Sequence, residues 1–342
     1  MKSLAVLALA LVAAHPLLCA AGPSTPGPYR VLTSARVGGA GGFDYVTADA
    51  ANRRLYIPRG DRVDVFDLDT LTPAGCVPGA KSVHGVAVDL ASGRAYSSSK
   101  PVLAWDARTL APMKSIDVSG RPDGIFWDAA SGRVFVLSHQ APSVTVLNGA
   151  DGSVAGTIDL DAAPEQGVCD GRGRVYIDLE DKDQVAVVDA KTLKVVSRYG
   201  LGGRGGVPAG LAIDAAHHVL FVCCRKPQVC VILDADDGRI VTALPLGAGT
   251  DGALFNPATQ EAFSSNYDGT LTVIRENSPT DFVVEQTVAT RPGARTCTLD
   301  SRTGRVFLVT AEYAPAPPGQ QGPGRPRLQM VPGSFAILAV GR

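Results

Sequence analysis

One pattern recurs seven times between Phe43 and Leu308, and it constrains the fold more than any other feature of the chain. Each copy is a short apolar run that ends at an acidic or amide residue, followed by a turn, often with Gly-Arg, and a second apolar run. The residues that end the first runs lie 39 to 44 positions apart: Asp49, Asp89, Asp128, Asp170, Asp214, Asn256 and Asp300. A period of about 40 residues with runs of strand length is typical of β-propeller blades. The sequence therefore predicts an all-β, seven-bladed propeller.

Composition and charge agree with this fold. The 342 residues are 45% hydrophobic, and the 38 glycines and 24 prolines lie mostly between the repeats, where tight turns need them. One blade cannot bury its faces without neighbours, so residues 29–342 are predicted to form a single domain. The 32 basic and 33 acidic residues give a net charge of −1, which provides no global field toward nucleic acid or an anionic membrane.

The N-terminus has the features of a targeting segment. Lys2 supplies a positive charge, and the apolar run from Leu4 to Ala14 is shorter than the about 20 residues of a membrane-spanning helix. Cys19-Ala20-Ala21 offers small residues for cleavage before Gly22. We therefore expect a signal peptide over residues 1–21, a short linker over 22–28, no membrane span, and a periplasmic or secreted protein.

The two ends of the repeat array predict how the ring closes. The seventh repeat has a third strand at Phe335–Val340, but the chain stops at Arg342 before a fourth. The strand-like run Tyr29–Val37 precedes the first repeat, so it is expected to pair with the last strand and close the propeller. Residues 314–334 form a Pro/Gly-rich loop insertion in this last blade, which is a lid, a partner-binding arm or an insertion without a role.

Six cysteines remain after the expected cleavage, and an exported protein permits disulfides. Cys223 and Cys230 flank the turn 225–228, so a hairpin with an even-length loop places them opposite each other. A loop of five residues would instead pair Cys224 with Cys230. We therefore predict a local disulfide, with Cys223 and Cys230 as the leading pair. The other hypothesis is that Cys169, Cys230 and Cys297 are small buried hydrophobic residues, and we expect this of Cys169 and Cys297.

The repeats resemble those of the YVTN β-propeller family, the YncE-like exported proteins. The resemblance rests on a Pro-x-Gly opening (Pro122–Gly124 and Pro208–Gly210), on an Asp-x-x-x-Gly-Arg turn (Asp128–Arg133 and Asp300–Arg305), and on the Tyr/Phe-Val run that follows. It covers residues 29–342, although no blade contains the literal Tyr-Val-Thr-Asn motif. The resemblance implies an exported scaffold, some of whose relatives bind nucleic acid or other macromolecules, and a wider fold group that includes quinoprotein subunits.

Residues that vary while the scaffold repeats are the candidates for function. The recurring acidic residues are expected to cap turns by bonding their own backbone. The position before each innermost strand varies, and in a propeller it lies at the mouth of the central channel: Asp44, His84, Asp123, Gln166, Ala209, Asp251 and Arg295. The loops between second and third strands reach the same face and add Arg59, Lys100, His139, Lys182, Arg225, Tyr267 and Tyr313. His217 and His218 fall on the opposite face and are expected to be solvated turn residues.

These residues predict a binding module that holds a ligand or macromolecule at a polar channel mouth. One alternative is a lactonase-like hydrolase, because two carboxylates and an imidazole at Asp44, His84 and Asp123 suit a divalent metal or acid/base catalysis. A second alternative is a partner subunit in a quinoprotein pathway. The sequence favours a binding protein over an enzyme, without a cofactor, as a monomer with an unknown ligand or protein partner. Nucleic acid enters only through the family resemblance.

Overall fold

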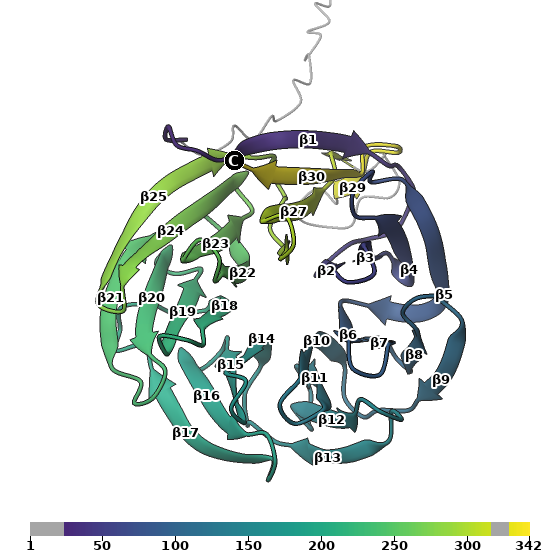
Figure 1. The fold of residues 1–342 in the computed structure, drawn as a ribbon, viewed down its shortest axis with the longest axis horizontal. Helices are drawn as coiled ribbons and strands as arrows, with labels where there is room; N and C mark the ends of the chain where they lie inside the picture. The colour runs from purple at the N-terminus through teal and green to yellow at the C-terminus, as the bar shows by residue number, and fades with distance from the viewer. Residues whose placement is uncertain (1–23, 316–327) are drawn as a thin grey trace, which may run out of the picture.

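The computed structural model describes residues 24–315 and 328–342, and these form a ring of seven four-stranded antiparallel sheets around a central channel (Figure 1). The described residues form strands and turns, with no helix among them. The predicted all-β, seven-bladed propeller is confirmed. None of the described elements is a helix long and apolar enough to cross a membrane. The predicted signal peptide at 1–21 lies outside the described residues.

In six blades the strands follow one another from the channel outward, in chain order. Blade 1 comprises β2 (Thr47–Asp49), β3 (Arg54–Pro58), β4 (Gly60–Asp67) and β5 (Pro73–Val83), and blade 2 comprises β6 (Val86–Asp89), β7 (Arg94–Ser97), β8 (Val102–Asp106) and β9 (Pro112–Ile116). Blade 3 comprises β10 (Pro122–Asp128), β11 (Arg133–Ser138), β12 (Val144–Asn148) and β13 (Val154–Ile158), and blade 4 comprises β14 (Pro164–Cys169), β15 (Arg174–Leu179), β16 (Gln184–Asp189) and β17 (Lys194–Gly200). Blade 5 comprises β18 (Pro208–Asp214), β19 (Val219–Cys224), β20 (Val229–Asp234) and β21 (Ile240–Pro245), and blade 6 comprises β22 (Thr250–Asn256), β23 (Glu261–Asn266), β24 (Thr270–Ser278) and β25 (Asp281–Ala289).

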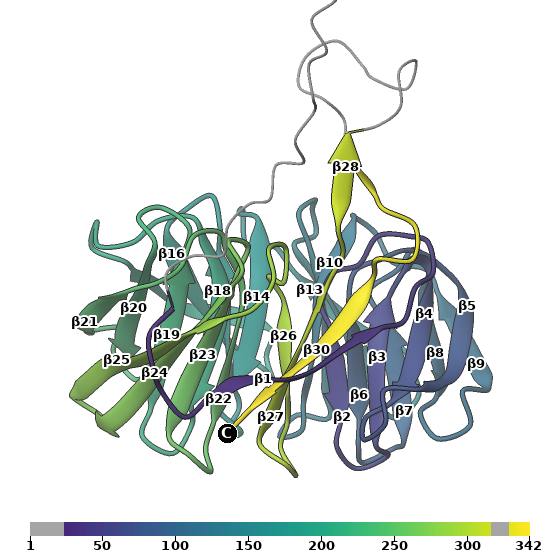
Figure 2. The same ribbon diagram turned by 90° about the horizontal axis from the view of Figure 1, so that it is seen from above.

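Blade 7 joins the two ends of the chain. Its order from the channel outward is β26 (Cys297–Asp300), β27 (Arg305–Thr310), β30 (Ala336–Gly341) and β1 (Arg30–Arg36). The N-terminal strand β1 crosses the outside of β30 antiparallel to it (Figure 2). The predicted closure by the N-terminal strand is therefore confirmed, and it removes the open edge that blade 7 would otherwise expose.

The hydrophobic core is divided into seven clusters, each between two adjacent blades. Successive residues of a strand point to opposite faces of its sheet, so one strand serves two clusters. Leu55 and Ile57 pack toward blade 7, whereas Tyr56 between them packs toward blade 2. This burial on both faces explains why the repeats contain continuous apolar runs rather than alternating ones.

The recurring acidic residues are buried and cap the turns that follow the innermost strands. Asp89 Oδ1, for example, accepts hydrogen bonds from the backbone N–H groups of Ala91 and Ser92, at 2.9 and 3.1 Å. Equivalent bonds occur at the turn residues of the other blades. The interpretation of these residues as turn caps is confirmed.

The two ends of the insertion at 314–334 pair with each other as two short strands. Its strands β28 (Tyr313–Pro315) and β29 (Leu328–Met330) pair antiparallel and project beyond one face of the disc (Figure 2). Residues 316–327 of the predicted loop lie outside the described residues.

Two cysteines of blade 5 have the predicted strand register, but they do not form the predicted disulfide bond. Cys223 is directly opposite Cys230 across the β19–β20 hairpin, as an even-length loop requires. Both are free thiols in this structure, so the predicted disulfide is not formed. Both side chains are buried in the apolar cluster between blades 5 and 6, where they pack as small hydrophobic residues.

Candidate functional site at the channel mouth

The candidate site lies where the innermost strands begin, at one end of the channel. The mouth position lies five residues before the turn residue of each blade, at or just before the start of the innermost strand. The predicted residues at this position are Asp44, His84, Asp123, Asp251 and Arg295. The loops that follow β11 and β19 add His139 and Arg225 on the same face.

Blade 4 corrects the prediction at one position. In this blade Gln166 occupies the position of the repeat glycine, and Gly167 is the residue after it. Gly167 therefore stands three residues before Asp170, where Gly124 stands four before Asp128. Counting back five residues from Asp170 gives Glu165, not Gln166. In the structure Glu165 is the residue that joins the other charged side chains at the mouth. Alignment on the turn residue, rather than on glycine, would have identified it.

Acidic and basic side chains alternate around the mouth, and we call this set the charged ring. Its members are, in order, Asp44, His84, Asp123, His139, Glu165, Arg225, Asp251 and Arg295. Every blade contributes at least one of them. Blade 5 has Ala209 at the ring position, and Arg225 from its own loop fills this gap.

The two histidines form one half of the charged ring, and each contacts two carboxylates through a single nitrogen. His84 Nδ1 lies 2.7 Å from Asp44 Oδ2 and 3.3 Å from Asp123 Oδ1. His139 Nε2 lies 3.2 Å from Asp123 Oδ2 and 3.1 Å from Glu165 Oε2. Asp123 therefore bridges the two imidazoles with its two oxygens.

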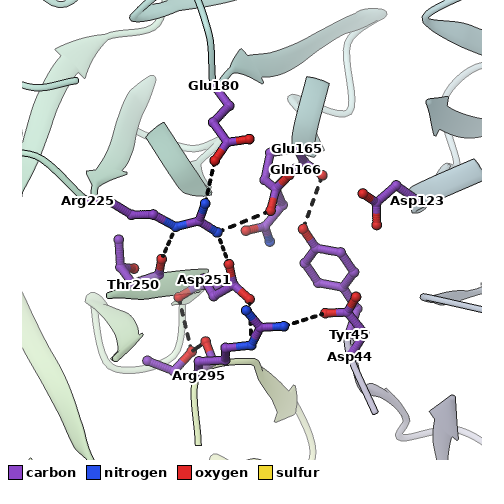
Figure 3. Close-up of polar contacts among 12 residues, drawn as sticks. Asp44, Tyr45, Asp123, Glu165, Gln166, Glu180, Arg225, Thr250, Asp251 and Arg295 are labelled. Carbon is purple, nitrogen blue, oxygen red and sulfur yellow. Dashed lines mark hydrogen bonds and ion pairs between the residues drawn. The ribbon is translucent and has the colours of Figure 1, made fainter. Parts of the chain in front are cut away.

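The two arginines form the other half (Figure 3). The guanidinium of Arg225 contacts Asp251 and Glu180, and it lies 3.4 Å from Glu165 Oε1. Arg295 Nε lies 3.0 Å from Asp251 Oδ2, and its Nη2 lies 3.9 Å from Asp44 Oδ1, which closes the ring. Glu180 and Glu165 were both absent from the predicted site.

Burial and ion pairing set the protonation of the charged ring. Hydrogen bonds donated to Asp44 and Glu165 raise the pKa of His84 and of His139, that of His139 to about 8. Burial raises the pKa of Asp251 to about 7 and also raises the pKa of Asp123. Burial acts in the same direction on Glu165, but its hydrogen bond with His139 and the charge of Arg225 lower its pKa overall. The protonation of the ring therefore changes near neutral pH.

A second layer lies directly beneath the charged ring. At the next position four blades have glycine, whereas blades 1, 4 and 7 have Tyr45, Gln166 and Thr296. Tyr45 Oη donates to the backbone oxygen of Glu165 at 3.3 Å, across from blade 1 to blade 4. Gln166 Nε2 donates to the oxygen of Ala253 at 3.1 Å, and its Oε1 accepts from the N–H groups of Leu211 and Ala253. Gln166 is thus a cross-link between blades, not a member of the ring.

Glycine provides the space that these two long side chains occupy. A Cβ added at Gly124 would lie 2.5 Å from the backbone oxygen of Glu165, and one at Gly210 would lie 3.1 Å from the backbone of Gly252. The innermost strands therefore approach one another closely at this level. The glycines of the repeat keep the channel narrow there, so that the side chains of only a few blades fill it.

A depression of about 600 Å³ adjoins the ring over blades 1 to 3. Asp44 and His84 of the ring line it, together with Phe43, Lys100 and Arg121. Lys100 Nζ donates to the backbone oxygen of Gly120 at 2.6 Å, and the side chains of Lys100 and Arg121 have no carboxylate partner among the described residues. The depression therefore has an excess of positive charge.

The remaining predicted residues lie away from the charged ring. Arg59 is buried beneath the mouth, with its guanidinium carbon 3.6 Å from the ring centroid of Phe335 and no hydrogen-bond partner for the guanidinium among the described residues. Burial lowers its pKa to about 10. Tyr267 is half-exposed on the rim. The sequence places these residues on the mouth-side loops, but it does not show which loop side chains turn inward.

Two parts of the ring have the donor set of a divalent cation. Asp44, His84 and Asp123 form one group whose ligand atoms all lie within 4.8 Å of one another. Asp123, His139 and Glu165 form a second. Imidazole and carboxylate ligands suit Zn²⁺ and similar metals, so both groups fit such an ion.

Comparisons with known proteins identify the fold. No family model and no curated protein sequence matches the chain. Among solved structures it is similar to "Structure of U3-55K", with a TM-score of 0.71, 12% identity, and coverage of 91% of this chain and 98% of that one. It is also similar to "Crystal structure of RRP9 WD40 repeats", with a TM-score of 0.72, 12% identity, and coverage of 92% and 98%. At this identity the similarity shows the propeller fold alone.

Proposed function

We propose that this protein is a binding module that recognises a small carboxylate-bearing ligand at the channel mouth. The observation that carries the proposal is the charged ring, because all seven blades build it but no single residue type recurs in every blade. A scaffold that repeats elsewhere and varies at one convergent set of polar groups has the features of a ligand site. The YVTN-like repeat motifs support an exported binding protein as the setting.

The charges around the depression favour an anionic ligand. Lys100 and Arg121 stand at its rim, whereas Asp44, the carboxylate that lines it, is already paired with His84 at 2.7 Å. An incoming carboxylate would gain charge-assisted hydrogen bonds from these two cations without displacing an existing pair. Phe43 offers an apolar contact for the rest of the ligand. The ring fixes the position of His84 and so defines the inner wall of the site.

A thermal-shift screen with small carboxylates, followed by calorimetric titration, tests this function. A ligand at about 100 times its dissociation constant stabilises the protein by about 2.7 kcal/mol. The double variant Lys100→Ala/Arg121→Ala should weaken binding at least about ten-fold, since charged hydrogen bonds contribute about 1.5–3 kcal/mol. Lys191→Ala, an exposed change in a turn on the opposite face, is the matched control. Ligand binding that is unaffected by the double variant would disprove the assignment.

A second candidate function is metal-dependent hydrolysis, and the bridging position of Asp123 between the two histidines favours it. Asp44, His84, Asp123, His139 and Glu165 would hold the metal, which would supply a Lewis acid and an activated water. Metal analysis of the purified protein and assays with lactones and phosphate esters test this candidate. Asp123→Asn should abolish any such activity, because it removes a shared ligand from both groups.

A further inference from the structure

A second cluster of ionisable groups lies at the end of the channel opposite the ring, between blades 5 and 6. It comprises Asp214 at the end of β18, His217 in the following turn, and Glu276 near the end of β24. Two of these residues depart from what the other blades have at the same positions.

Glu276 occupies a position that is otherwise apolar or glycine. The position is defined by one hydrogen bond that recurs in blades 1 to 6. The backbone N–H of the residue donates to the carbonyl of the residue directly before the second strand of its blade. The equivalent residues in blades 1 to 5 are Leu68, Ala107, Gly149, Ala190 and Ala235. In blade 6 it is a glutamate that is only 5% exposed. Alanine packs well at this position, so a buried carboxylate there lowers stability unless it is paired, hydrogen-bonded or bound to a metal.

His217 also replaces a different type of residue. Three positions after the turn residue, blades 1, 2, 3 and 7 have a small polar side chain that donates to the turn carboxylate: Asn52, Ser92, Ser131 and Thr303. In blade 5 the residue is His217, whose Nδ1 lies 2.9 Å from Asp214 Oδ2. The same nitrogen lies 2.7 Å from Glu276 Oε1 of the next blade. His217 is exposed in its turn, as predicted, but its imidazole also contacts two buried carboxylates.

The described residues offer too few hydrogen-bond donors for the carboxylate oxygens of this cluster. A single Nδ1–H lies between two carboxylates, and one proton cannot fully serve both. Glu276 Oε2 is buried without a hydrogen-bond partner among the described residues. Burial raises the pKa of Glu276, which reflects the cost of ionising it there without a further cation. The cluster therefore lacks positive charge.

We propose that Asp214, His217 and Glu276 bind a divalent transition-metal cation, with zinc as the reference ion, and so join blades 5 and 6. Their ligand atoms all lie within 4.8 Å of one another, so one ion with metal–ligand bonds of about 2.0–2.2 Å reaches all three after small side-chain movements. One imidazole and two carboxylates suit zinc better than calcium, which prefers oxygen ligands only. The side chain of His217 is 43% exposed, so the ion has a route from solvent and room for water ligands.

The test uses the full chain, in a variant whose channel mouth has lost a metal ligand. In an Asp123→Asn background, which removes a shared carboxylate from both mouth groups, metal-free protein is titrated with Zn²⁺ by calorimetry. We expect one equivalent to bind and the melting temperature to rise. Glu276→Ala restores the residue of blades 2, 4 and 5, and His217→Ser restores that of blades 2 and 3, so both variants should fold. Each should weaken Zn²⁺ binding by more than about ten-fold, because even outer-shell partners of metal ligands contribute about 10–100-fold.

Glu276→Ala also separates a metal site from a simple ion pair. Without a bound metal, Glu276→Ala should melt at the same or a higher temperature than its parent, because it removes an incompletely paired buried carboxylate. Failure of the Asp123→Asn protein to bind Zn²⁺, or retention of the same affinity in both blade-like variants, would show that the cluster is only an ion pair. Neither outcome depends on the ligand proposed for the channel mouth.

Discussion

Aspartate has two distinct roles in this propeller, and its hydrogen-bond partners separate them. Asp128 is a turn residue whose carboxylate accepts from the N–H groups of Ala130 and Ser131 and from the hydroxyl of Ser131. Asp123, five residues earlier on the same strand, contacts His84 of blade 2 and His139 of its own blade. The first role recurs in each blade and supports the fold, whereas the second depends on neighbouring blades.

Removal of a turn carboxylate should lower stability without affecting the mouth. Asp128→Ala removes the acceptor of the partly buried N–H of Ser131, so we expect a loss of about 1–2 kcal/mol in the free energy of unfolding. Urea denaturation measures it. Asp117→Ala, at an exposed aspartate, is the control and should stay within about 0.5 kcal/mol of the wild type. Equal effects of the two changes would contradict the structural role of Asp128.

The pairing of His139 predicts a stability change above neutral pH. Its folded pKa is raised to about 8, chiefly by the hydrogen bond with Glu165, above the unfolded value of about 6.5. The contribution is therefore fully present below pH 6.5 and is lost as the pH rises through 8. The shift corresponds to about 2 kcal/mol, which we reduce to about 1 kcal/mol because the side chain is 33% exposed and screened by solvent.

The measurement is the free energy of urea unfolding at pH 6 and pH 9, for the wild type and for His139→Gln. Other groups in the ring titrate in this range, so the difference between the two proteins isolates His139. The wild type should lose about 1 kcal/mol more than the variant as the pH rises. Parallel pH profiles would show that the His139–Glu165 pair adds nothing to stability.

At the scale of single elements, the innermost strand of blade 4 determines how the mouth is built. Its spacing from proline to turn residue is that of blade 3, so Glu165 takes the ring position and Gln166 the position where four other blades have glycine. Gln166 then bonds to blades 5 and 6 through Leu211 and Ala253. One strand thereby supplies a ring carboxylate and a cross-link beneath the ring.

The cross-link should contribute measurably to stability. Gln166→Ala removes three hydrogen bonds from the channel, and we expect a loss of about 2–3 kcal/mol at about 1 kcal/mol per bond. Thermal or urea unfolding detects this loss. Gln228→Ala makes the same chemical change at an exposed loop residue and should have little effect. A Gln166→Ala protein as stable as this control would show that water replaces the bonds without cost.

At the scale of the whole molecule, the chain termini hold the ring closed. The backbone of β1 pairs with β30, and Tyr29 just before it extends the contact to blade 6. Tyr29 Oη donates to Glu261 Oε2 at 2.5 Å, and the C-terminal residue Arg342 contacts the same carboxylate at 2.6 Å. Gln286 of β25 bonds to both backbone groups of Tyr29, so residues from both ends fasten blade 7 to blade 6.

Loss of the N-terminal strand should therefore open the propeller. A chain that begins at Gly38 lacks Tyr29 and β1, and we expect a destabilisation on the order of 5 kcal/mol from about five backbone hydrogen bonds, with a drop in Tm on the order of 10 °C. The exposed edge of β30 should also promote association. A chain that begins at Pro28 keeps both elements and serves as the control. Calorimetry and light scattering test this, and unchanged melting and monodispersity of the shorter chain would rule out the closure.

The seven blades, the turn caps and the closure of the ring could all be predicted from the sequence. These features depend on local patterns: a period of about 40 residues, Asp-capped turns and strand-length apolar runs, each of which has the same physical cause in every copy. The pattern also located most of the mouth, because the first residue of an innermost strand must lie at that end of the channel. It named Asp44, His84, Asp123, Asp251 and Arg295 correctly as neighbours.

Only the tertiary structure decided which of these side chains meet and how. The alternation of acids and bases and the exclusion of Gln166 and Arg59 from the ring depend on contacts between blades. The same is true of the approach of Glu276 to His217 across the interface between blades 5 and 6. Distances between blades depend on packing of the whole ring, and no local pattern in the chain encodes them.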